Sequence, residues 1–555
     1  MREGYAHAGG GSAATRRLQP LDQWARDARA AGYVPAVGER LRTIAGQHPG
    51  RAVGVLAALA VLATALSAGA TDRLTLSTTE ARTPVLHIRA AGALAPGSAP
   101  FEVAVRTMRT QLSADPGVSA VRVAPRQGSE DFEVLLVRLK GAGRNRDSAL
   151  TRIQRNLDPG PLTLEFRGPA AAVRAAKDQA LDDLVLLLAA LPLTALMLAL
   201  TVGLRGTGVV LLAAVATVSL AALACELLAG VFDVSWLALA GAAAAGTLLT
   251  LQLSSIGVAG AGPATLLCAG AAAAAAFGAL ALLGVDYLTS LALGGALAAL
   301  IAVPVSITAA SATLAGVRQP GLRGGAPWGG IASLVGLSRA LAAILGLVVL
   351  IAMLIVVAPI ERLATAAIGA AQAPAVEAVG LAGAGIAALV VVAGLGMTQA
   401  RRFWLPSLAA LAAAIPVVAS AGLLIVTFED GNLEKALDFT SNGAVSLGAI
   451  AAAGATVAAL GAAQAVSLAG VGRETQELRP DKLRVVAAVS ICLPAAAVSC
   501  VTGVAAGVAL GFGSAPFEKE FGLAVAAGLA LQLLVVGALM APALLRVTYR
   551  TAADQ

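Results

Sequence analysis

Twelve long apolar segments, separated by short charged stretches, limit what this chain can fold into more than any other feature of its sequence. Each is near or above the roughly 20 residues that a helix needs to cross a bilayer. Because lipid offers no hydrogen-bonding partners, a crossing segment must satisfy its own backbone groups, and these segments are therefore predicted to be α-helices. They lie at residues 52–70, 180–203, 208–231, 234–256, 262–284, 288–315, 338–358, 376–398, 404–427, 443–470, 485–512 and 520–545.

The composition agrees with a polytopic α-helical membrane protein. Hydrophobic residues make up 58% of the 555 residues and charged residues only 13%, against about 25% charged residues in soluble domains. The net charge of +7 comes from basic residues near helix ends, which indicates control of topology rather than binding of nucleic acid. Aromatic residues, at 3%, are too few for stacking on bases.

The sequence offers little material for catalysis. The three histidines lie outside the apolar segments, and the four cysteines lie inside them at spacings that match no metal site. No nucleophile–base pair or phosphate-binding loop stands out. We therefore expect no enzyme activity, no metal and no cofactor.

Arginines and acidic residues separate onto opposite sides of the predicted membrane. By the positive-inside rule, both termini are cytoplasmic and residues 71–177 are extracytoplasmic, in the cytoplasmic (inner) membrane of a bacterium. The arginines on the side of the amino-terminal tail are Arg205, Arg318, Arg323, Arg339, Arg401, Arg402, Arg473, Arg479, Arg484 and Arg546. The acidic residues on the other side are Asp233, Asp286, Glu361, Glu429, Asp430 and Glu434.

Residues 71–177 have the character of a small soluble domain. Alternation of apolar and polar residues predicts strands at 84–90, 118–124, 132–139 and 161–166. Helical spacing at 98–114 follows a capping Ser98, a second helix is expected from a capping Asp147 to Leu157, and Asp115-Pro116-Gly117 is a predicted turn. The order β-α-β-β-α-β is that of a split-βαβ, ferredoxin-like α+β domain.

The sequence therefore divides into tails, helices and loops. Residues 1–50 form a basic cytoplasmic tail, which is either a partner-binding segment or an ordinary disordered tail. The remaining parts are 51–70 (first helix), 71–177 (external domain), 178–316 (helices two to six), 317–337 (cytoplasmic linker), 338–358 (seventh helix), 359–375 (short external loop), 376–548 (helices eight to twelve) and 549–555 (cytoplasmic tail).

The helices fall into two pseudo-repeated halves, and the second begins near residue 338. Each half has one helix, an external connection and five further helices. The fourth helix of each half carries the pattern Gln-x-x-Ser, as Gln252 to Ser255 and Gln464 to Ser467. Polar residues at equivalent places in two repeats favour a shared role in the middle of the membrane.

Three stretches resemble the MMPL (mycobacterial membrane protein large) transporters of the resistance-nodulation-division superfamily. MRTQLSADPGVSAVRV (108–123) is similar to the helix, Pro-Gly turn and strand of the family's external domain. Residues 162–205 are similar to its strand, helix and second membrane helix, and 515–547 to its last helix. The resemblance implies a transporter that exports a lipid or other hydrophobic molecule to the cell envelope. The external assembly of the family is half missing in this chain, which points to a homo-oligomer or an envelope protein as partner.

The chain departs from the family's pattern at the positions that carry protons. The family typically has Asp-Tyr in the fourth and tenth helices, whereas both helix interiors here lack an acid. The second external domain is also reduced to the loop 359–375. Uncharged polar residues occupy the relay positions, namely Thr247, Gln252, Ser255, Gln464, Ser467 and Gln532.

Three other carboxylates are candidates for proton coupling. Glu226 lies inside the third predicted helix, five residues from its outer end. A buried carboxylate in a membrane costs free energy, so Glu226 either has a functional role or reaches outward to water. Asp182 and Asp183 begin the second predicted helix at its outer boundary, a position typical of solvated interface residues. Two functions stay open: a transporter of hydrophobic cargo without the usual relay, and a non-pumping relative that binds lipid or scaffolds envelope proteins.

Overall fold

The structure is a computed structural model of the whole chain. It describes residues 33–67, 85–92, 98–124, 133–140, 144–167, most of 187–316, short pieces of 414–427, and 447–474, 481–513 and 516–535. Asp182 and Asp183, the seventh to ninth predicted membrane helices except for those pieces, and the loop 359–375 lie outside the described residues.

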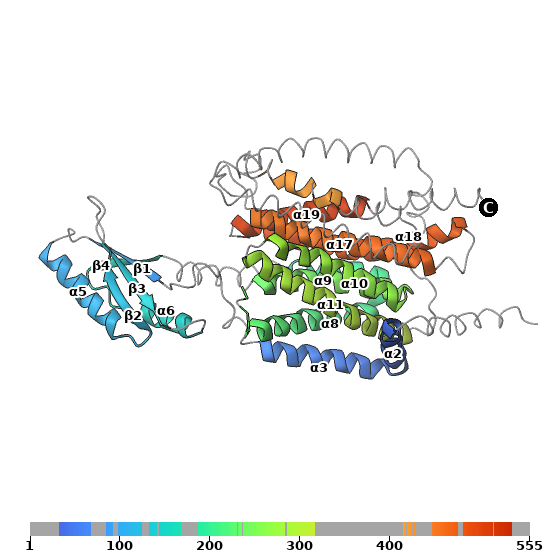
Figure 1. The fold of residues 1–555 in the computed structure, drawn as a ribbon, viewed down its shortest axis with the longest axis horizontal. Coiled ribbons are helices and arrows are strands. Elements are labelled where there is room, and N and C mark those ends of the chain that lie inside the picture. Colours follow the sequence, from blue (N-terminus) through green and yellow to red (C-terminus); the bar gives the residue numbers. More distant parts are fainter. Residues whose placement is uncertain are drawn as a thin grey trace, which may run out of the picture.

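Seven described helices are long and apolar enough to cross a membrane. They pack side by side in one bundle (Figure 1). In chain order they are α3 (Pro49–Ser67), α8 (Leu191–Ala229), α9 (Leu237–Val258), α10 (Pro263–Gly278) with the 3-10 turn η3 (Ala279–Leu283), α11 (Asp286–Gly316), α17 (Leu447–Glu474) and α18 (Asp481–Gly511). A further helix, α19 (Pro516–Val535), packs against α18 and α17. The multi-pass membrane protein is confirmed, while the count of twelve stays a prediction.

Helix α8 covers parts of two predicted membrane segments, 180–203 and 208–231. Gly203 inside it has φ 79° and ψ 163°, a backbone conformation that no α-helix contains and that favours glycine. α8 is therefore two helices that meet at Gly203. The break lies two residues before Arg205, where the sequence analysis places a cytoplasmic connection.

The directions of the packed helices agree with alternating crossings. Gly246 of α9 lies near Ala298 of α11, and Gly257 lies near Ala310, so these two helices run in the same direction. Contacts between α9 and α18 run the opposite way, since Gln252 meets Ser499 while Leu248 lies beside Gly503. Helices four and six should be parallel in an alternating chain, and helices four and eleven antiparallel.

Glycines, chiefly Gly241 and Gly294, bring α9 and α11 together closely. A Cβ atom on Gly294 would run into the backbone of Ala238, and one on Gly241 would meet the carbonyl of Leu291. Only glycine allows this separation. Small residues at such crossings let helices in lipid gain van der Waals contact, since apolar surface alone gives them no reason to associate.

The α+β unit has four strands and two helices, in the order that the sequence predicts. The elements are β1 (Val85–Gly92), α5 (Ala99–Ala114), β2 (Val118–Val123), β3 (Glu133–Leu139), α6 (Arg144–Asn156) and β4 (Leu162–Arg167). The sheet is antiparallel with strand order β2-β3-β1-β4, so Ile88 of β1 pairs with Leu135 and Phe166. Figure 1 shows the unit beyond one end of the bundle. Its place outside the cell stays a prediction.

The core of the unit follows the predicted amphipathic patterns. Phe101, Met108 and Leu112 line one face of α5 and pack with Ile88 and Leu135 of the sheet. Ser98 caps α5, and its Oγ accepts a hydrogen bond from the Phe101 N–H at 3.4 Å.

The start of α6 differs from the prediction. The helix begins at Arg144, so Asp147 lies inside its first turn and is not the N-cap. The prediction was wrong because an acid in a first turn is stabilised by the same helix dipole that favours it at the cap.

An ion pair holds the predicted turn at Asp115 against α6. Arg152 donates from Nε to Asp115 Oδ2 at 2.9 Å and from Nη2 to Oδ1 at 3.0 Å. The Gly117 N–H donates to the same Oδ1 at 2.7 Å, which closes the turn. The hydrogen bond from Arg152 lowers the pKa of the Asp115 carboxyl from its ordinary value.

We expect Asp115→Asn to loosen this turn at neutral pH but not in acid. Because the folded-state pKa is lowered, the stabilisation is present above the unfolded pKa of about 3.9 and is lost as the pH falls through the lower folded value. Hydrogen exchange at Gly117 and Val118 in the full chain should be a fewfold faster in the variant at neutral pH. The two rates should converge below about pH 3.

The matched control is Asp158→Asn. Asp158 Oδ1 accepts the Gly160 N–H at 3.0 Å in a similar turn, with no arginine hydrogen bond to its carboxylate. This substitution should leave local exchange unchanged. Equal effects of the two substitutions at pH 7 would contradict a role for the Arg152 pair.

Candidate functional site: an uncharged polar cluster between four helices

Four helices place uncharged polar side chains at one point inside the bundle. Gln252 of α9, Ser499 of α18 and Gln532 of α19 have 0% of their surface exposed, and Gln464 of α17 has 3%. With Cys500 of α18, these residues form what we call the amide cluster. Burial of polar groups at this level is costly unless they bond to one another.

Hydrogen bonds connect the cluster across both halves of the chain. Gln532 Nε2 donates to Gln464 Oε1 at 3.1 Å, and Gln464 Nε2 donates to Cys500 Sγ at 3.3 Å. The neighbouring residue in α18, Ser499, has its Oγ 3.2 Å from Gln252 Oε1, and the same hydroxyl also lies within hydrogen-bonding distance of the Ala495 and Ala496 carbonyls. One step along α18 therefore joins the glutamine of the fourth helix to that of the tenth.

The predicted relay positions thus divide into two groups. Gln252, Gln464 and Gln532 meet in the amide cluster. Ser255 instead donates to the carbonyl of Leu251 in its own helix at 2.7 Å, which is common for hydroxyls in membrane helices. Thr247 is half-buried and takes no part in the cluster.

Several buried polar atoms in these helices keep unused hydrogen-bonding capacity. They are Gln252 Nε2, Gln532 Oε1 and the hydroxyl oxygens of Ser254, Ser467 and Thr502. Such atoms are uncommon in folded proteins, and each costs about 1–3 kcal/mol. The cluster is therefore polar enough to bond to a further group, but it carries no charge.

A pair of hydrogen-bonded threonines lies near the cluster and includes a residue of α9. Thr250 Oγ1 donates to Thr217 Oγ1 of α8 at 2.9 Å, and Thr217 in turn donates to the carbonyl of Ala213 at 3.0 Å. Both threonines are fully buried. They extend the uncharged polar contacts of the fourth helix to the third.

Glu226 lies away from these contacts. It is buried in α8, with 7% of its surface exposed, beside a small apolar group that includes Cys225, Val234 and Ala238. Nine residues, or about 13 Å of helix, separate it from Thr217. Glu226 is the one carboxylate inside the apolar spans of the seven described membrane helices, whereas Asp286, Glu474 and Asp481 lie at helix ends.

Sequence reasoning did not identify the residues that join the helices. Ser499 and Cys500 lie in an apolar helix with no motif around them, and only the crossing of α18 with α9 and α17 brings them to the glutamines.

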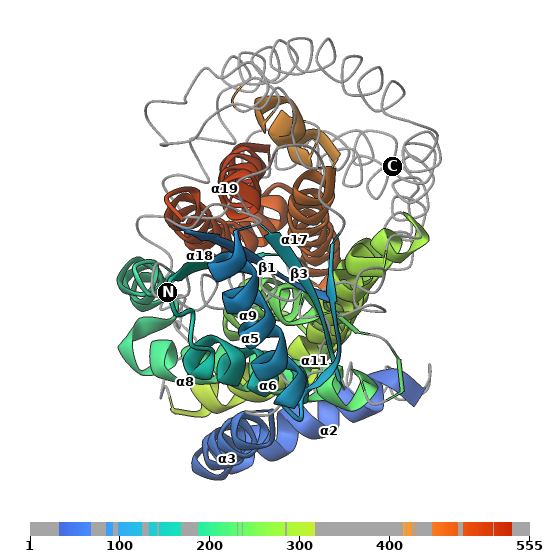
Figure 2. The same ribbon diagram turned by 90° about the vertical axis from the view of Figure 1, so that its left-hand side faces the viewer.

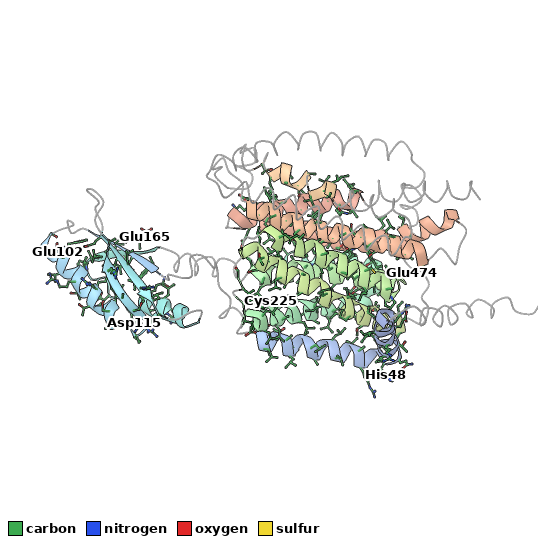
Figure 3. All side chains as sticks on the ribbon, viewed as in Figure 1. His48, Glu102, Asp115, Glu165, Cys225 and Glu474 are labelled. Atoms are coloured by element: carbon green, nitrogen blue, oxygen red, sulfur yellow. The ribbon has the colours of Figure 1, made fainter. Side chains whose placement is uncertain are left out.

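Glu474, at the end of α17, was also missed. Its carboxylate accepts the Gly262 N–H at 2.9 Å and the Thr265 hydroxyl at 2.7 Å. Figure 3 labels Glu474 at the end of the bundle that is far from the α+β unit. The contact covers the amino end of α10, where a negative charge is favourable. It joins a helix of the second half to one of the first.

Comparison with solved structures identifies the architecture. The chain aligns with the crystal structure of SecDF, a translocon-associated membrane protein from Thermus thermophilus, with a TM-score of 0.53 and 13% identity. The alignment covers 91% of this chain and 99% of that one. SecDF in its super-membrane-facing form gives a TM-score of 0.50, 13% identity, and coverage of 92% and 99%. The hedgehog release protein Disp from the water bear Hypsibius dujardini aligns with a TM-score of 0.45 and 10% identity. That alignment covers 76% of this chain and 77% of Disp.

This chain shares the fold of the SecDF structures. At 13% identity the likeness to SecDF establishes the arrangement of the chain and nothing about its cargo. No family model matches the sequence, and no curated protein matches it either. The resemblance to the MMPL transporters therefore stays a prediction.

We predict that Gln464→Leu destabilises the bundle more than a substitution outside the cluster. The change removes two hydrogen bonds and leaves the Gln532 amide without its acceptor, for an expected loss of about 1–2 kcal/mol. Reversible unfolding of the purified full chain in detergent measures the difference.

Thr247→Ala is the matched control, because it removes a half-buried hydroxyl from the fourth helix without touching the cluster. Its effect should stay within about 0.5 kcal/mol. Indistinguishable losses for the two variants would mean that the amide contacts do not stabilise the fold.

Proposed function

We propose that this chain is a transporter of a lipid or other hydrophobic molecule that does not use a proton relay in its fourth and tenth helices. The proposal rests on one observation: the groups that meet between these helices are amides, hydroxyls and a thiol from both halves. The cargo class is supported by the resemblance to the MMPL transporters and by the shared RND-like fold.

Proton coupling requires a group that changes charge and thereby favours one conformation over another. Amides and hydroxyls hold one charge state throughout the physiological range. They stabilise a conformation through hydrogen bonds that pH does not change. The amide cluster can therefore hold the two halves together or rearrange with them, but a proton gradient gives it no energy.

The predicted setting completes the proposal. The protein lies in the bacterial cytoplasmic membrane with both termini inside and the α+β unit outside. Its cargo is a membrane lipid or a hydrophobic small molecule. A second copy or an envelope protein supplies the external surface that the short second loop lacks.

A non-pumping role is the second candidate, and a specific likeness favours it. The similar structure of SecDF is that of a translocon-associated membrane protein, so this architecture serves in at least one protein that associates with another membrane assembly. Under this candidate the chain binds lipid or scaffolds envelope proteins, and the amide cluster is a fixed contact.

The first candidate predicts flux that ignores the proton gradient. In proteoliposomes, the full chain should move a fluorescent hydrophobic probe at the same rate with and without an imposed pH difference. Glu226→Gln should leave that rate unchanged, because the proposed transport does not use a proton carried by this carboxylate, the one inside the apolar spans of the described membrane helices. A stopped-flow assay of probe release measures both rates.

Gly294→Leu is the control that shows the flux depends on the protein. This substitution cannot fit against the Ala238 backbone, and it should abolish transport. Flux that an outside-acid gradient drives, and that Glu226→Gln abolishes, would overturn the proposal. No movement of the probe under any condition would favour the non-pumping role.

A further inference from the structure

The segment directly before the first membrane helix also forms an α-helix, which lies in a different direction from the membrane helices. Residues 33–47, which the sequence analysis assigns to an irregular basic tail, form α2 (Tyr33–Gln47). Figure 1 shows α2 end-on beside α3, and Figure 2 shows it along its length, so α2 lies across the end of the bundle. His48 separates the two helices, and Pro49 begins α3.

One face of α2 is fixed to the bundle. Gly38 lies so close to α10 that a Cβ atom there would be 2.8 Å from the Pro263 Cβ, and Ile307 of α11 is also near. Ala45 is buried, and Leu41 packs against the main core of the bundle. These contacts hold α2 at one height along the bundle axis.

The position of α2 along the bundle axis corresponds to the edge of the hydrocarbon layer of the membrane. α3 has 19 residues and is thus about 28 Å long, close to the thickness of the apolar layer. Its outer surface is apolar from Val55 onward, through Leu62 to Leu66, as expected for contact with lipid tails. Since α2 directly precedes α3, it lies where the tails meet the headgroups.

A second face of α2 is apolar and uncovered. Val37 is 62% exposed and Ile44 is 60% exposed, and seven residues place them on the same side of the helix. Large exposed apolar side chains on a helix that lies in the plane of the interface are typical of helices that enter the headgroup layer.

The charged residues of α2 and of the start of α3 are mostly positive. Arg40 and Arg51 are exposed and Arg42 is half-buried, while Glu39 is the acidic residue of α2. Among the described residues, no carboxylate forms a salt bridge with any of the three arginines. Three guanidinium groups at the level of the headgroups are available to bind phosphate oxygens.

We propose that α2 is an interfacial helix that binds anionic phospholipid headgroups through Arg40, Arg42 and Arg51, with Val37 and Ile44 inserted at the tail–headgroup boundary. Anionic lipid gains about 1 kcal/mol for each arginine near the membrane surface. The helix contacts α10 and α11, so bound lipid touches the same assembly that carries the amide cluster.

Titration of the purified full chain with phosphatidylglycerol and phosphatidylcholine of identical acyl chains tests the proposal, with bound lipid counted by native mass spectrometry. The native chain should prefer phosphatidylglycerol. Each arginine changed to glutamine, beginning with Arg40→Gln, should reduce that preference up to about fivefold. Arg40→Lys should retain most of it, because the charge remains.

Arg106→Gln with Arg109→Gln is the matched control. These exposed arginines lie on α5 of the α+β unit, and their loss should not alter the lipid preference. Equal binding of the two lipids by the native chain would overturn the proposal, as would an equal loss in the control. Binding of a polyglutamate peptide in place of lipid would instead assign α2 to an acidic protein partner.

Discussion

The close approach of α9 and α11 is the contact on which the rest of the bundle depends. Lipid tails are as apolar as leucine side chains, so burial of apolar surface does not drive helices together inside a membrane. Backbone contact through Gly241 and Gly294 replaces that force with dense van der Waals packing. This packing fixes the rotation of α9, so that Thr250 faces α8 and Gln252 faces α18. The amide cluster exists because this central helix is held in one rotation.

The same packing gives the two halves of the chain a small number of polar contacts. The amide cluster joins α9 to α17, α18 and α19 in the middle of the bundle, and Glu474 joins α17 to α10 at one end. The first contact is uncharged, while the second uses a carboxylate at a helix end near water. If the halves move against each other, the middle contact can rearrange without any change of charge. That separation is the physical basis for the proposed transport that does not depend on protons.

Predictions from the sequence were most accurate where the signal is local. Ser98 caps α5 and Asp115 closes its turn because each acts on a backbone group two or three residues away. Gln252 and Gln464 could be selected as a pair because they occupy equivalent places in the two halves. Ser499 and Cys500 could not be selected, since their importance comes from residues 247 and 36 positions away in the chain. α2 was missed because its arginines suggested a polar tail. Its apolar residues, such as Val37 and Ile44, form one face only when they are placed at helical spacing.

The sequence by itself determined that this is a multi-pass helical membrane protein with a β-α-β-β-α-β unit. Apolar length and strand alternation are properties of single segments, and lipid and water sort such segments regardless of their neighbours. It also determined that the fourth and tenth helices lack an acid. Only the tertiary structure decided which uncharged residues meet, that Glu226 lies about 13 Å along α8 from Thr217, and that α2 lies across the bundle. These facts depend on helix rotation and crossing, which arise from many weak contacts between segments far apart in the chain.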